Sequence, residues 1–399
     1  MHIERGVRMK ILSVNAGSST LKFQLFEMPE ETVLISGVFE RIGIDNSFYT
    51  IKLNDEKIKK EVQLKDHKQA FEILVNELIE NKVINLPEEI KAIGHRTVQG
   101  GEKYDHTVVI DDSVIADMEK YAPLAPLHNP AAITGIRAAQ EVFKNALQTA
   151  VFDTAFHATI DEVNYIYPVP YEWYEKYGVR KYGMHGTSHR FVSKRASELL
   201  GKENSKVITC HIGNGASISA VVNGKCIDTS MGLTPNAGVM MGSRCGDIDC
   251  SIVPYIMEQT GMTAKEIDNE LNKKSGLLGV SGVSSDSRDV EDGIKEGNEK
   301  CILAQNMYVR RIINYISMYF VEMNGADAIV FTAGVGENSI STRKQIIEGL
   351  SSLGIKLDDE LNNCRGKETL ISSEDSSVKC YVIPTNEELM IARDTYELV

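Results

Sequence analysis

The alternation of apolar and polar residues near the start of the chain predicts a β-hairpin. Apolar residues within 11–14 lead into a polar turn, and alternation resumes over residues 21–25. The same pattern returns half a chain later, with Gly213 in the place of Gly17. Two similar hairpins in one chain indicate a duplicated domain.

The turns of both hairpins are rich in small and polar residues. Backbone N–H groups converge in such turns and can surround phosphate oxygens, because no bulky side chain intrudes. Lys22 lies just past the first turn and could add a positive charge to the same phosphate. An ordinary Ser/Gly hairpin turn is the alternative, and the turn composition leaves both interpretations open.

Strand patterns and helical patterns then follow one another along the chain. Short apolar or alternating runs predict strands at 32–39, 47–53, 90–96, 148–152, 328–332 and 379–383. Amphipathic periodicity predicts helices at 65–81, 113–122, 131–143, 252–260, 263–274, 301–324 and 389–397, and one that ends at Leu200. Thr187 or Ser188 is the expected N-terminal cap of that helix.

Two polar segments of the second half are predicted to lack regular structure. Residues 276–288 are rich in glycine and serine and predict a loop, either a linker or a ligand-binding loop. Residues 333–338 follow a buried strand and predict a turn that opens a helix. Such a turn is typical of nucleotide sites, although two glycines alone are a weak signal.

Composition narrows the class of protein. A chain of 399 residues predicts two or three domains, and a net charge of −13 argues against a nucleic-acid partner or a polybasic membrane partner. No apolar run approaches the ~18 residues that span a bilayer. The start of the chain lacks the apolar core of a signal peptide, and residues 1–8 are expected to extend before a first strand at Met9. The seven cysteines form no regular framework, which is typical of reduced cytoplasmic thiols.

Several charged residues stand where α/β proteins place ligand chemistry. Asp153 follows a buried strand, a common position for a catalytic group, although a helix cap is the alternative. Arg96 ends another strand near glycines, which suits an anion clamp or a surface salt bridge. His185 and Arg244 are flanked by glycines, and His185 precedes a predicted helix, so both suit an anion.

Several common nucleotide and hydrolase motifs are absent. The chain contains no GxxxxGK[ST] motif, no complete GxGxxG motif after a strand and no GxSxG motif. A Walker-type site, a dinucleotide fold and an α/β-hydrolase nucleophile are therefore not supported. A strand meander, helices after strands and a duplication point to a different ATP-binding fold.

The ordered set of short motifs resembles the acetate kinase family. From about Met9 to the C-terminus, the chain contains N-A-G-S-S-T-L-K, G-H-R, P-L-H-N-P, F-D-T-A-F-H, Y-G-M-H-G-T-S-H, H-I-G-N-G, M-M-G-S-R-C-G-D-I-D, S-S-D-S-R-D, A-G-V-G-E-N and P-T-N-E-E. Each motif alone is weak, but the whole set in the family's order and spacing is specific.

The resemblance implies an α/β fold of two duplicated ribonuclease H-like domains, as in actin-like ATPases, with ATP between them. Residues 9–155 with the C-terminal helix 385–399 are expected to form the acyl-substrate domain. Residues 156–384 are expected to form the nucleotide-binding domain. The family is typically homodimeric.

The resemblance also assigns roles to residues. Asp153 matches the catalytic aspartate, Arg96 the substrate-binding arginine, and His128 a supporting histidine. His185 and Arg244 match the transition-state stabilisers. Asn15 and Glu387 fall at the positions for Mg²⁺, for which Mn²⁺ is able to substitute. The nucleotide positions are Lys22, His211, Ile212, Gly213, Asn214, Gly215, Asp286, Ser287, Arg288, Gly334, Val335, Gly336, Glu337 and Asn338.

The implied activity is reversible phosphoryl transfer from ATP to acetate, which gives acetyl phosphate and ADP. A carboxylate acceptor is ionised at neutral pH and needs no general base, so Asp153 is expected to act through Mg²⁺ or electrostatics. Met184 stands where the family usually has phenylalanine, and Val98 and Leu127 are expected pocket walls, so propionate is a second candidate substrate. An ATPase of the same superfamily and an inactive homologue are the rival interpretations.

Overall fold

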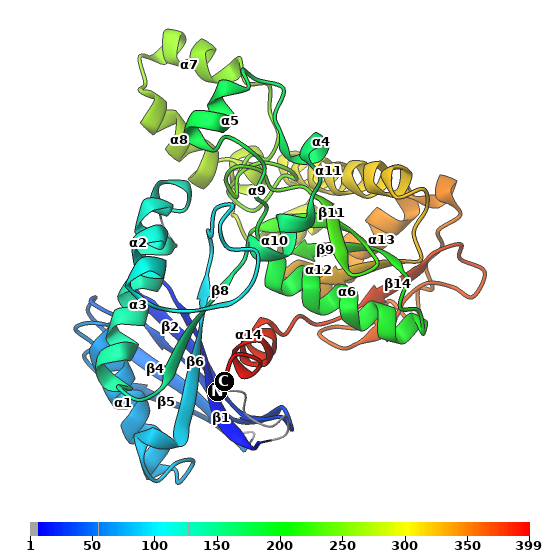
Figure 1. The fold of residues 1–399 in the computed structure, drawn as a ribbon. Coiled ribbons are helices and arrows are strands. Elements are labelled where there is room, and N and C mark those ends of the chain that lie inside the picture. Colours follow the sequence, from blue (N-terminus) through cyan, green and yellow to red (C-terminus); the bar gives the residue numbers. More distant parts are fainter. Residues whose placement is uncertain (1–6, 55, 127) are drawn as a thin grey trace. The chain divides into compact units, whose positions relative to one another are not determined.

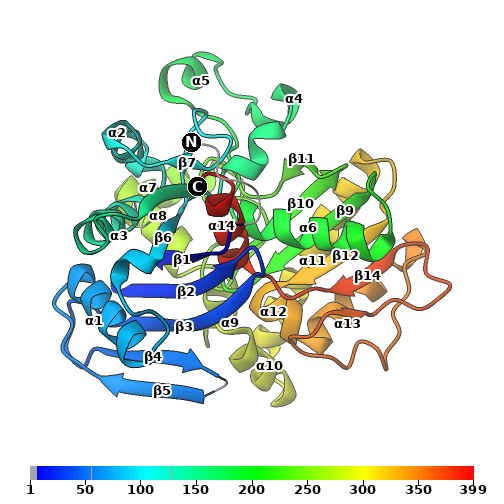
Figure 2. The same cartoon turned by 60° about the horizontal axis from the view of Figure 1, so that its bottom comes forward.

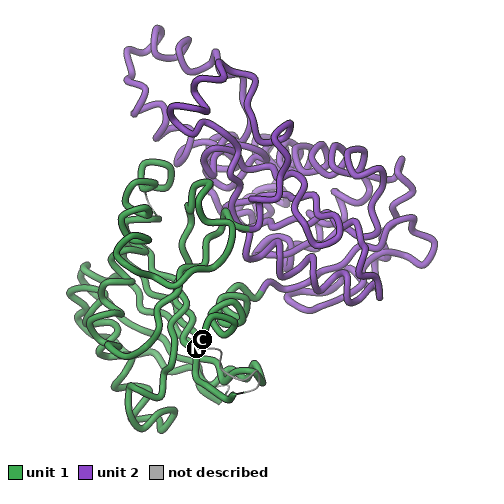
Figure 3. The backbone as a smooth tube through the Cα atoms, viewed as in Figure 1, with its two compact units in different colours: residues 1–155, 386–399 green, residues 156–385 purple. Residues whose placement is uncertain are grey.

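The computed structural model describes residues 7–54, 56–126 and 128–399. Leu127 and most of the expected N-terminal extension therefore lie outside the described residues. The chain divides into two compact units, residues 1–155 with 386–399 (unit 1) and residues 156–385 (unit 2), which Figure 3 colours separately. No helix of the described part is both long and apolar enough to cross a bilayer.

Unit 1 contains a sheet whose described strands run in the order β5-β4-β3-β2-β1-β6-β8-β7. The strands are β1 (Met9–Ala16), β2 (Thr20–Met28), β3 (Thr32–Glu40), β4 (Phe48–Leu53), β5 (Glu56–Glu61), β6 (Ile90–Thr97), β7 (Val108–Val109) and β8 (Leu147–Phe152). Strands β1 to β5 form an antiparallel meander, whereas β6 is parallel to both β1 and β8. The predicted first hairpin is confirmed, and Asn15 lies within β1, opposite Lys22 of β2.

Helices cover both faces of this sheet (Figures 1 and 2). They are α1 (His67–Glu80), α2 (Asp112–Lys120), α3 (Asn129–Val142) and α14 (Glu387–Tyr396), with short 3-10 turns at Pro87–Glu89 and Ala122–Leu124. Leu12 and Val14 of β1 belong to the core that includes α1 and α3, whereas Met9 and Ile11 pack with Ala392 of α14. Alternate residues of one strand point to opposite faces, so α14 lies on the face opposite α1 and α3.

Unit 2 contains a second sheet, whose described strands run in the order β11-β10-β9-β12-β14-β13. The strands are β9 (Lys206–Ile212), β10 (Ala216–Val222), β11 (Lys225–Thr229), β12 (Ala328–Thr332), β13 (Thr369–Leu370) and β14 (Lys379–Val382). The inner order β11-β10-β9-β12-β14 repeats the order β3-β2-β1-β6-β8 of unit 1, with the same parallel and antiparallel pairings. The duplication predicted from the two hairpins is confirmed.

The helices of unit 2 follow the strands and fill long connections. They are α4 (Glu162–Tyr165), α5 (Glu172–Tyr177), α6 (Gly186–Leu200), α7 (Ile252–Thr260), α8 (Ala264–Lys273), α9 (Gly276–Ser281), α10 (Ser287–Lys295), α11 (Glu299–Glu322), α12 (Ala333–Asn338) and α13 (Ile340–Gly349). Short 3-10 turns occupy Ala155–Thr159 and Ser351–Leu353. Helix α6 packs against β9 and β12, and α11 packs against β9, β10 and α9.

Three local predictions in unit 2 are wrong. Residues 276–288 are not one loop, because α9 occupies the first half, with Leu277 buried, and α10 begins at Ser287. Residues 333–338 are themselves the short helix α12 rather than a turn before one. The residue before α6 is His185, with a positive φ of 59°, whereas Thr187 and Ser188 lie buried inside the helix.

A buried histidine gives unit 1 a predictable acid sensitivity. His95 on β6 is 2% exposed and its Nε2 lies 2.7 Å from Gln148 Oε1. Burial lowers the pKa of His95 to about 4, although the bond to Gln148 acts in the opposite direction. The unfolded chain, with an ordinary pKa of about 6.5, therefore binds the proton first as the pH falls. The stability linked to His95 is complete above about pH 6.5 and is lost progressively toward pH 4.

We expect His95 to lower the free energy of unfolding by about 2 kcal/mol between pH 7 and pH 5. Urea unfolding of the wild type and of His95→Gln at both values measures this effect. The other titrating groups are shared by the two proteins, so the difference between them isolates His95. An equal loss of stability on acidification in both proteins would contradict the prediction.

Candidate active site

Three charged side chains meet in unit 1 at the ends of two parallel strands and the start of a helix. Arg96 lies near the end of β6, Asp153 follows β8, and Glu387 lies in the first turn of α14. Arg96 Nη2 lies 2.6 Å from Asp153 Oδ2, and Arg96 Nε lies 3.8 Å from Glu387 Oε2. Asp153 is only 1% exposed, so this ion pair is buried and is not a surface salt bridge.

The electrostatics of this cluster favour a further cation. Burial raises the pKa of Glu387 to about 6, and the neighbouring Asp153 and Glu388 act in the same direction, against Arg96 and Lys22. Burial also disfavours the charge of Arg96, but Asp153 and Glu387 outweigh it, so the pKa of Arg96 is raised. Lys22 Nζ pairs with Glu388 at 3.0 Å and remains largely exposed. The three carboxylates of Asp153, Glu387 and Glu388 thus face two cationic side chains, Arg96 and Lys22, which leaves one negative charge unbalanced.

The residues present fit a magnesium ion that keeps part of its water shell. The carboxylate of Glu387 and the amide oxygen of Asn15 are hard oxygen ligands of the kind that Mg²⁺ prefers. The described residues contain no group of three or more His, Cys, Asp or Glu side chains that could form a complete cage. Mg²⁺ in phosphoryl-transfer sites is commonly held by one or two protein oxygens together with substrate phosphates and water.

His128 is held beside the loop that follows β6. It precedes α3 directly, and Pro130 occupies the first turn of that helix. The buried Asn129 accepts a hydrogen bond from Gln99 N at 3.1 Å and donates to Gln99 O at 3.0 Å. These two bonds tie the His128 segment to the segment that carries Arg96, within the same unit.

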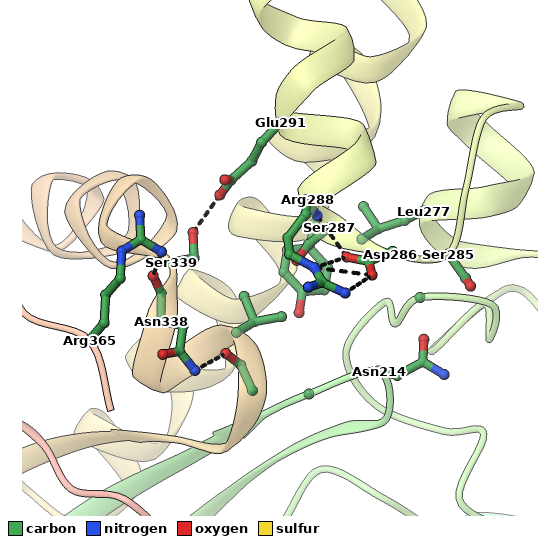
Figure 4. A pocket seen from close by; sticks show the side chains of 15 residues that line it. Asn214, Leu277, Ser285, Asp286, Ser287, Arg288, Glu291, Asn338, Ser339 and Arg365 are labelled. Carbon is green, nitrogen blue, oxygen red and sulfur yellow. Dashed lines mark hydrogen bonds and ion pairs between the residues drawn. The ribbon is translucent and has the colours of Figure 1, made fainter. Parts of the chain in front are cut away.

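Unit 2 contains a pocket of about 460 Å³ around the turn of the second hairpin (Figure 4). Residues predicted for the nucleotide that line it are Gly213, Asn214, Asp286, Ser287, Arg288, Gly334, Val335 and Asn338. Residues that were not predicted and also line it include Gly242, Leu277, Ser285, Glu291, Tyr308, Ser339 and Arg365. The pocket therefore gathers loops that are far apart in the sequence.

Some predicted nucleotide residues support this pocket and do not line it. Glu337 Oε1 accepts hydrogen bonds from Ala333 N at 2.8 Å and Thr385 N at 3.1 Å, which closes the short helix α12. Gly336 O accepts from the fully buried Arg343 at 3.0 Å. Arg343 also binds the carbonyl of Cys364, which fixes the segment before Arg365.

Asp286 and Arg288 form a local pair at the rim of the pocket (Figure 4). Asp286 caps α10, and its carboxylate accepts from the backbone N–H of Arg288 at 2.9 Å and from Arg288 Nη2 at 2.6 Å. The side-chain bond and the backbone bond from Arg288 lower the pKa of Asp286 to about 2. The Arg288 side chain is 85% exposed, so its charge is accessible to an anionic ligand.

His185 and Arg244 meet beside Gly215, a residue of the hairpin turn. A Cβ atom placed on Gly215 would lie 3.2 Å from Arg244 Nη1 and 3.7 Å from His185 Nε2. The ring of His185 stacks on that of His211, with centroids 4.1 Å apart. Burial lowers the pKa of Arg244, and no carboxylate of the described residues forms an ion pair with it. A partly buried arginine without an acidic partner suits an anionic ligand.

A close approach at Gly242 allows a direct test of the pocket. A Cβ atom at this position would lie 2.0 Å from Asn214 Oδ1 and 2.6 Å from the backbone oxygen of Ser285, and both residues line the pocket. We expect Gly242→Ala to raise the KM for the expected nucleotide substrate about tenfold, because the backbone of Ser285 must shift and the pocket loses its shape. Steady-state kinetics measure the effect, with Ser243→Ala, outside the pocket lining, as the control. An unchanged KM would exclude this pocket as the nucleotide site.

Comparison with known proteins extends over almost the whole chain. The acetokinase family profile matches residues 10–393. Acetate kinase from Bacillus subtilis (strain 168) is 54% identical over 391 residues, which cover 98% of this chain and 99% of the relative. Acetate kinase from Geobacillus kaustophilus is 55% identical over the same length, with the same coverage.

Solved structures agree with this result and confirm the predicted duplicated fold. The crystal structure of Porphyromonas gingivalis acetate kinase matches with a TM-score of 0.92 and 47% identity. The match covers 97% of this chain and 99% of the P. gingivalis chain. The crystal structure of a propionate kinase from Francisella tularensis matches with a TM-score of 0.93 and 43% identity. The match covers 98% of this chain and 100% of the F. tularensis chain. The sequence motifs, the duplicated α/β fold and these near-complete matches lead to one conclusion: the chain belongs to the acetokinase family.

Proposed function

We propose that this protein is an ATP-dependent kinase that transfers the terminal phosphoryl group of ATP to acetate, reversibly, giving acetyl phosphate and ADP. The observation that carries the proposal is 54% identity to a curated acetate kinase over 98% of the chain. The buried cluster of unit 1 and the glycine-lined pocket of unit 2 support it, because phosphoryl transfer depends on positioning and on neutralising charge.

In this proposal, residues 9–155 with 385–399 bind the acyl substrate. Arg96 binds the anionic substrate through its planar guanidinium, and Asp153 holds that guanidinium in place through the 2.6 Å ion pair. Asn15 and Glu387 would hold Mg²⁺, or Mn²⁺ in its place. The bound ion supplies positive charge to the phosphate oxygens of ATP. Acetate is already ionised at neutral pH, so Asp153 is not required as a proton acceptor.

Residues 156–384 bind the nucleotide in the same proposal. The backbone N–H groups of the turn after Gly213 and of the first turn of α12 surround the phosphates, and Arg288 adds positive charge at the rim. Lys22 is a further nucleotide contact in this proposal, as the resemblance implies. His185 and Arg244 stabilise the charge on the equatorial oxygens of the transferred group, and His128 has a supporting role.

The test is hydroxamate trapping of acyl phosphate formed from ATP and Mg²⁺ with acetate, propionate or butyrate in parallel. We expect acetate to give the highest kcat/KM, at least tenfold above butyrate. ADP release without any carboxylic acid is measured in the same series, because rapid acid-independent hydrolysis would favour an ATPase. No acyl phosphate with any acid would refute the kinase proposal. Chelation of Mg²⁺ is expected to abolish the product signal, and Mn²⁺ to restore it.

Propionate is the second candidate substrate. A solved propionate kinase matches this chain with a TM-score of 0.93 and 43% identity. Met184, where the family usually has phenylalanine, is buried, and a flexible methionine side chain adapts to ligands of different size. One methylene changes binding by only ~1–3 kcal/mol, so equal or higher kcat/KM for propionate would move the assignment to propionate kinase.

We also infer that the protein works as a cytoplasmic homodimer, without nucleic-acid or membrane partners. The net charge of −13 supports the absence of polyanionic partners. Light scattering after size-exclusion chromatography tests the dimer directly. A mass of about one chain at micromolar concentration would contradict it.

A further inference from the structure

A continuous chain of hydrogen bonds in unit 2 starts at His185 and ends at a backbone carbonyl. His185 Nδ1 lies 2.8 Å from Ser217 Oγ, which lies 2.7 Å from His189 Nε2. His189 Nδ1 lies 2.7 Å from Thr209 Oγ1, and this hydroxyl lies 3.4 Å from the carbonyl oxygen of Ser219. Ser217, His189, Thr209 and Ser219 are fully buried.

The carbonyl oxygen of Ser219, at the far end, determines the direction in which these hydrogen bonds are donated. A carbonyl oxygen only accepts, so the Thr209 hydroxyl donates to Ser219 and accepts from Nδ1–H of His189. His189 Nε2 then accepts from the Ser217 hydroxyl, and Ser217 accepts from Nδ1–H of His185. The opposite direction would form only three of these four bonds, because the Thr209 hydroxyl could not donate to the carbonyl oxygen of Ser219 and to His189 at once. Burial, together with His157 and His211, lowers the pKa of His189, which keeps this ring neutral with a single N–H.

Because these hydrogen bonds run from His185 Nδ1–H, the other ring nitrogen, Nε2, carries no proton when His185 is neutral. This Nε2 would lie 3.7 Å from a Cβ atom placed on Gly215, and Arg244 Nη1 would lie 3.2 Å from the same atom, while the ring of His211 stacks on His185 at 4.1 Å. A neutral imidazole with its proton on Nδ1 presents a lone pair at Nε2, which repels a phosphoryl oxygen. The same ring donates at Nε2 once it is an imidazolium, and this bond is charge-assisted.

We propose that Ser217 and His189 are positioning residues that hold His185 as the Nδ1–H tautomer, so that its Nε2 donates to a phosphoryl oxygen only as an imidazolium. Thr209 acts one step further away, because it sets the direction of the chain. The proposal rests on the role of His185 in the proposed function, whereas the tautomer itself is a property of the protein without substrate.

The tautomer is measured by long-range proton–nitrogen NMR on protein labelled with ¹⁵N-histidine. The spectrum is recorded on the alkaline side of the His185 titration, where the ring is neutral, and His185→Gln identifies the resonances. We expect a protonated Nδ1 and an unprotonated Nε2 in the wild type. A protonated Nε2 would overturn the proposal, whatever the kinetics show.

Thr209→Val is the sharpest variant, because it keeps the shape of the side chain and removes its hydroxyl. Nδ1 of His189 then faces a methyl group, so the proton of His189 moves to its Nε2 and donates to the Ser217 hydroxyl. Ser217 in turn donates to Nδ1 of His185, which therefore becomes the Nε2–H tautomer. Ser219→Ala is the matched control, since it removes a buried hydroxyl from β10 and keeps the carbonyl oxygen. An unchanged His185 tautomer in Thr209→Val would show that the hydrogen bonds from Thr209 through His189 and Ser217 (the relay) do not set it. The wild-type spectrum decides the tautomer even if a variant fails to fold.

Kinetics provide a second readout. We expect Thr209→Val to lower kcat for acyl phosphate formation about tenfold at neutral pH, with KM values within twofold, because a neutral donor replaces a charged one. Ser219→Ala is expected to keep the wild-type kcat. If the wild type forms no acyl phosphate, the proposed function fails, and the NMR experiment still decides whether the relay exists.

Discussion

Replacing Asp153 with asparagine is expected to lower kcat for acyl phosphate synthesis by about 10³-fold at saturating Mg²⁺. The substitution keeps the size of the side chain and removes one charge. Arg96 then loses its 2.6 Å ion pair, and among the described residues the carboxylate that stays within 4 Å of its guanidinium is that of Glu387, at 3.8 Å. The loss is expected in kcat because the charge of Asp153 organises the reacting groups and is not needed to take up a proton.

The control for this variant is Asp117→Asn in the same unit. Asp117 of α2 accepts from Tyr104 at 2.6 Å and pairs with Lys103, and neither partner belongs to the charged cluster. Its replacement is expected to change kcat less than twofold. Urea unfolding of both variants shows whether Asp153→Asn also destabilises unit 1, because a buried arginine without its partner costs about 3–5 kcal/mol. Near-wild-type kcat for Asp153→Asn would refute the electrostatic role.

Replacing Arg244 with lysine is expected to lower kcat about 10²-fold and to leave the KM for ATP within threefold. Lysine keeps the positive charge, but a point charge on a flexible stem does not reproduce the planar fork of a guanidinium. Arg244 has no acidic partner among the described residues, and only its Nη1 donates to a protein carbonyl, that of Pro235 at 3.3 Å, so its remaining N–H groups can donate to charge that develops during transfer. Steady-state kinetics with ATP and acetate measure both constants.

The matched control is Arg195→Lys on α6, in the same unit. Arg195 pairs with Glu198 at 2.9 Å and with Glu368 at 2.8 Å, and it is partly exposed. An exposed pair of this kind contributes little, so we expect wild-type kinetics. A raised KM with unchanged kcat in Arg244→Lys would instead place Arg244 in ground-state binding of the nucleotide.

Much of the candidate site was visible in the sequence because its residues follow strands. Arg96 and Asp153 stand at the ends of β6 and β8, and parallel neighbours in one sheet bring their ends together. The glycines of the second hairpin turn were equally recognisable, because a tight turn next to a ligand needs small residues. The roles of these residues came from the resemblance and stay proposals that the variants above test.

Other parts of the site left no recognisable local signal. Arg365 lines the pocket because buried Arg343 holds the segment before it, and the two residues come from separate stretches of the chain. His189 appeared to be one more residue of a helix, yet its ring joins Ser217 and Thr209 from two strands. Contacts between residues far apart in sequence depend on how helices and strands pack, which no local pattern encodes.

The sequence alone determined the two hairpins, the order of most helices and strands, the duplication and the family. Alternation, amphipathic periodicity and motif order are properties of the sequence itself, so they can be recognised without knowing how the helices and strands pack. Only the tertiary structure decided that residues 276–281 form a helix, because burial of Leu277 and packing against α11 outweigh the loop preference of glycine and serine. It also decided which atoms face one another: the pairing of Arg96 with Asp153, the pocket around Asn214, and the relay behind His185 are set by long-range packing.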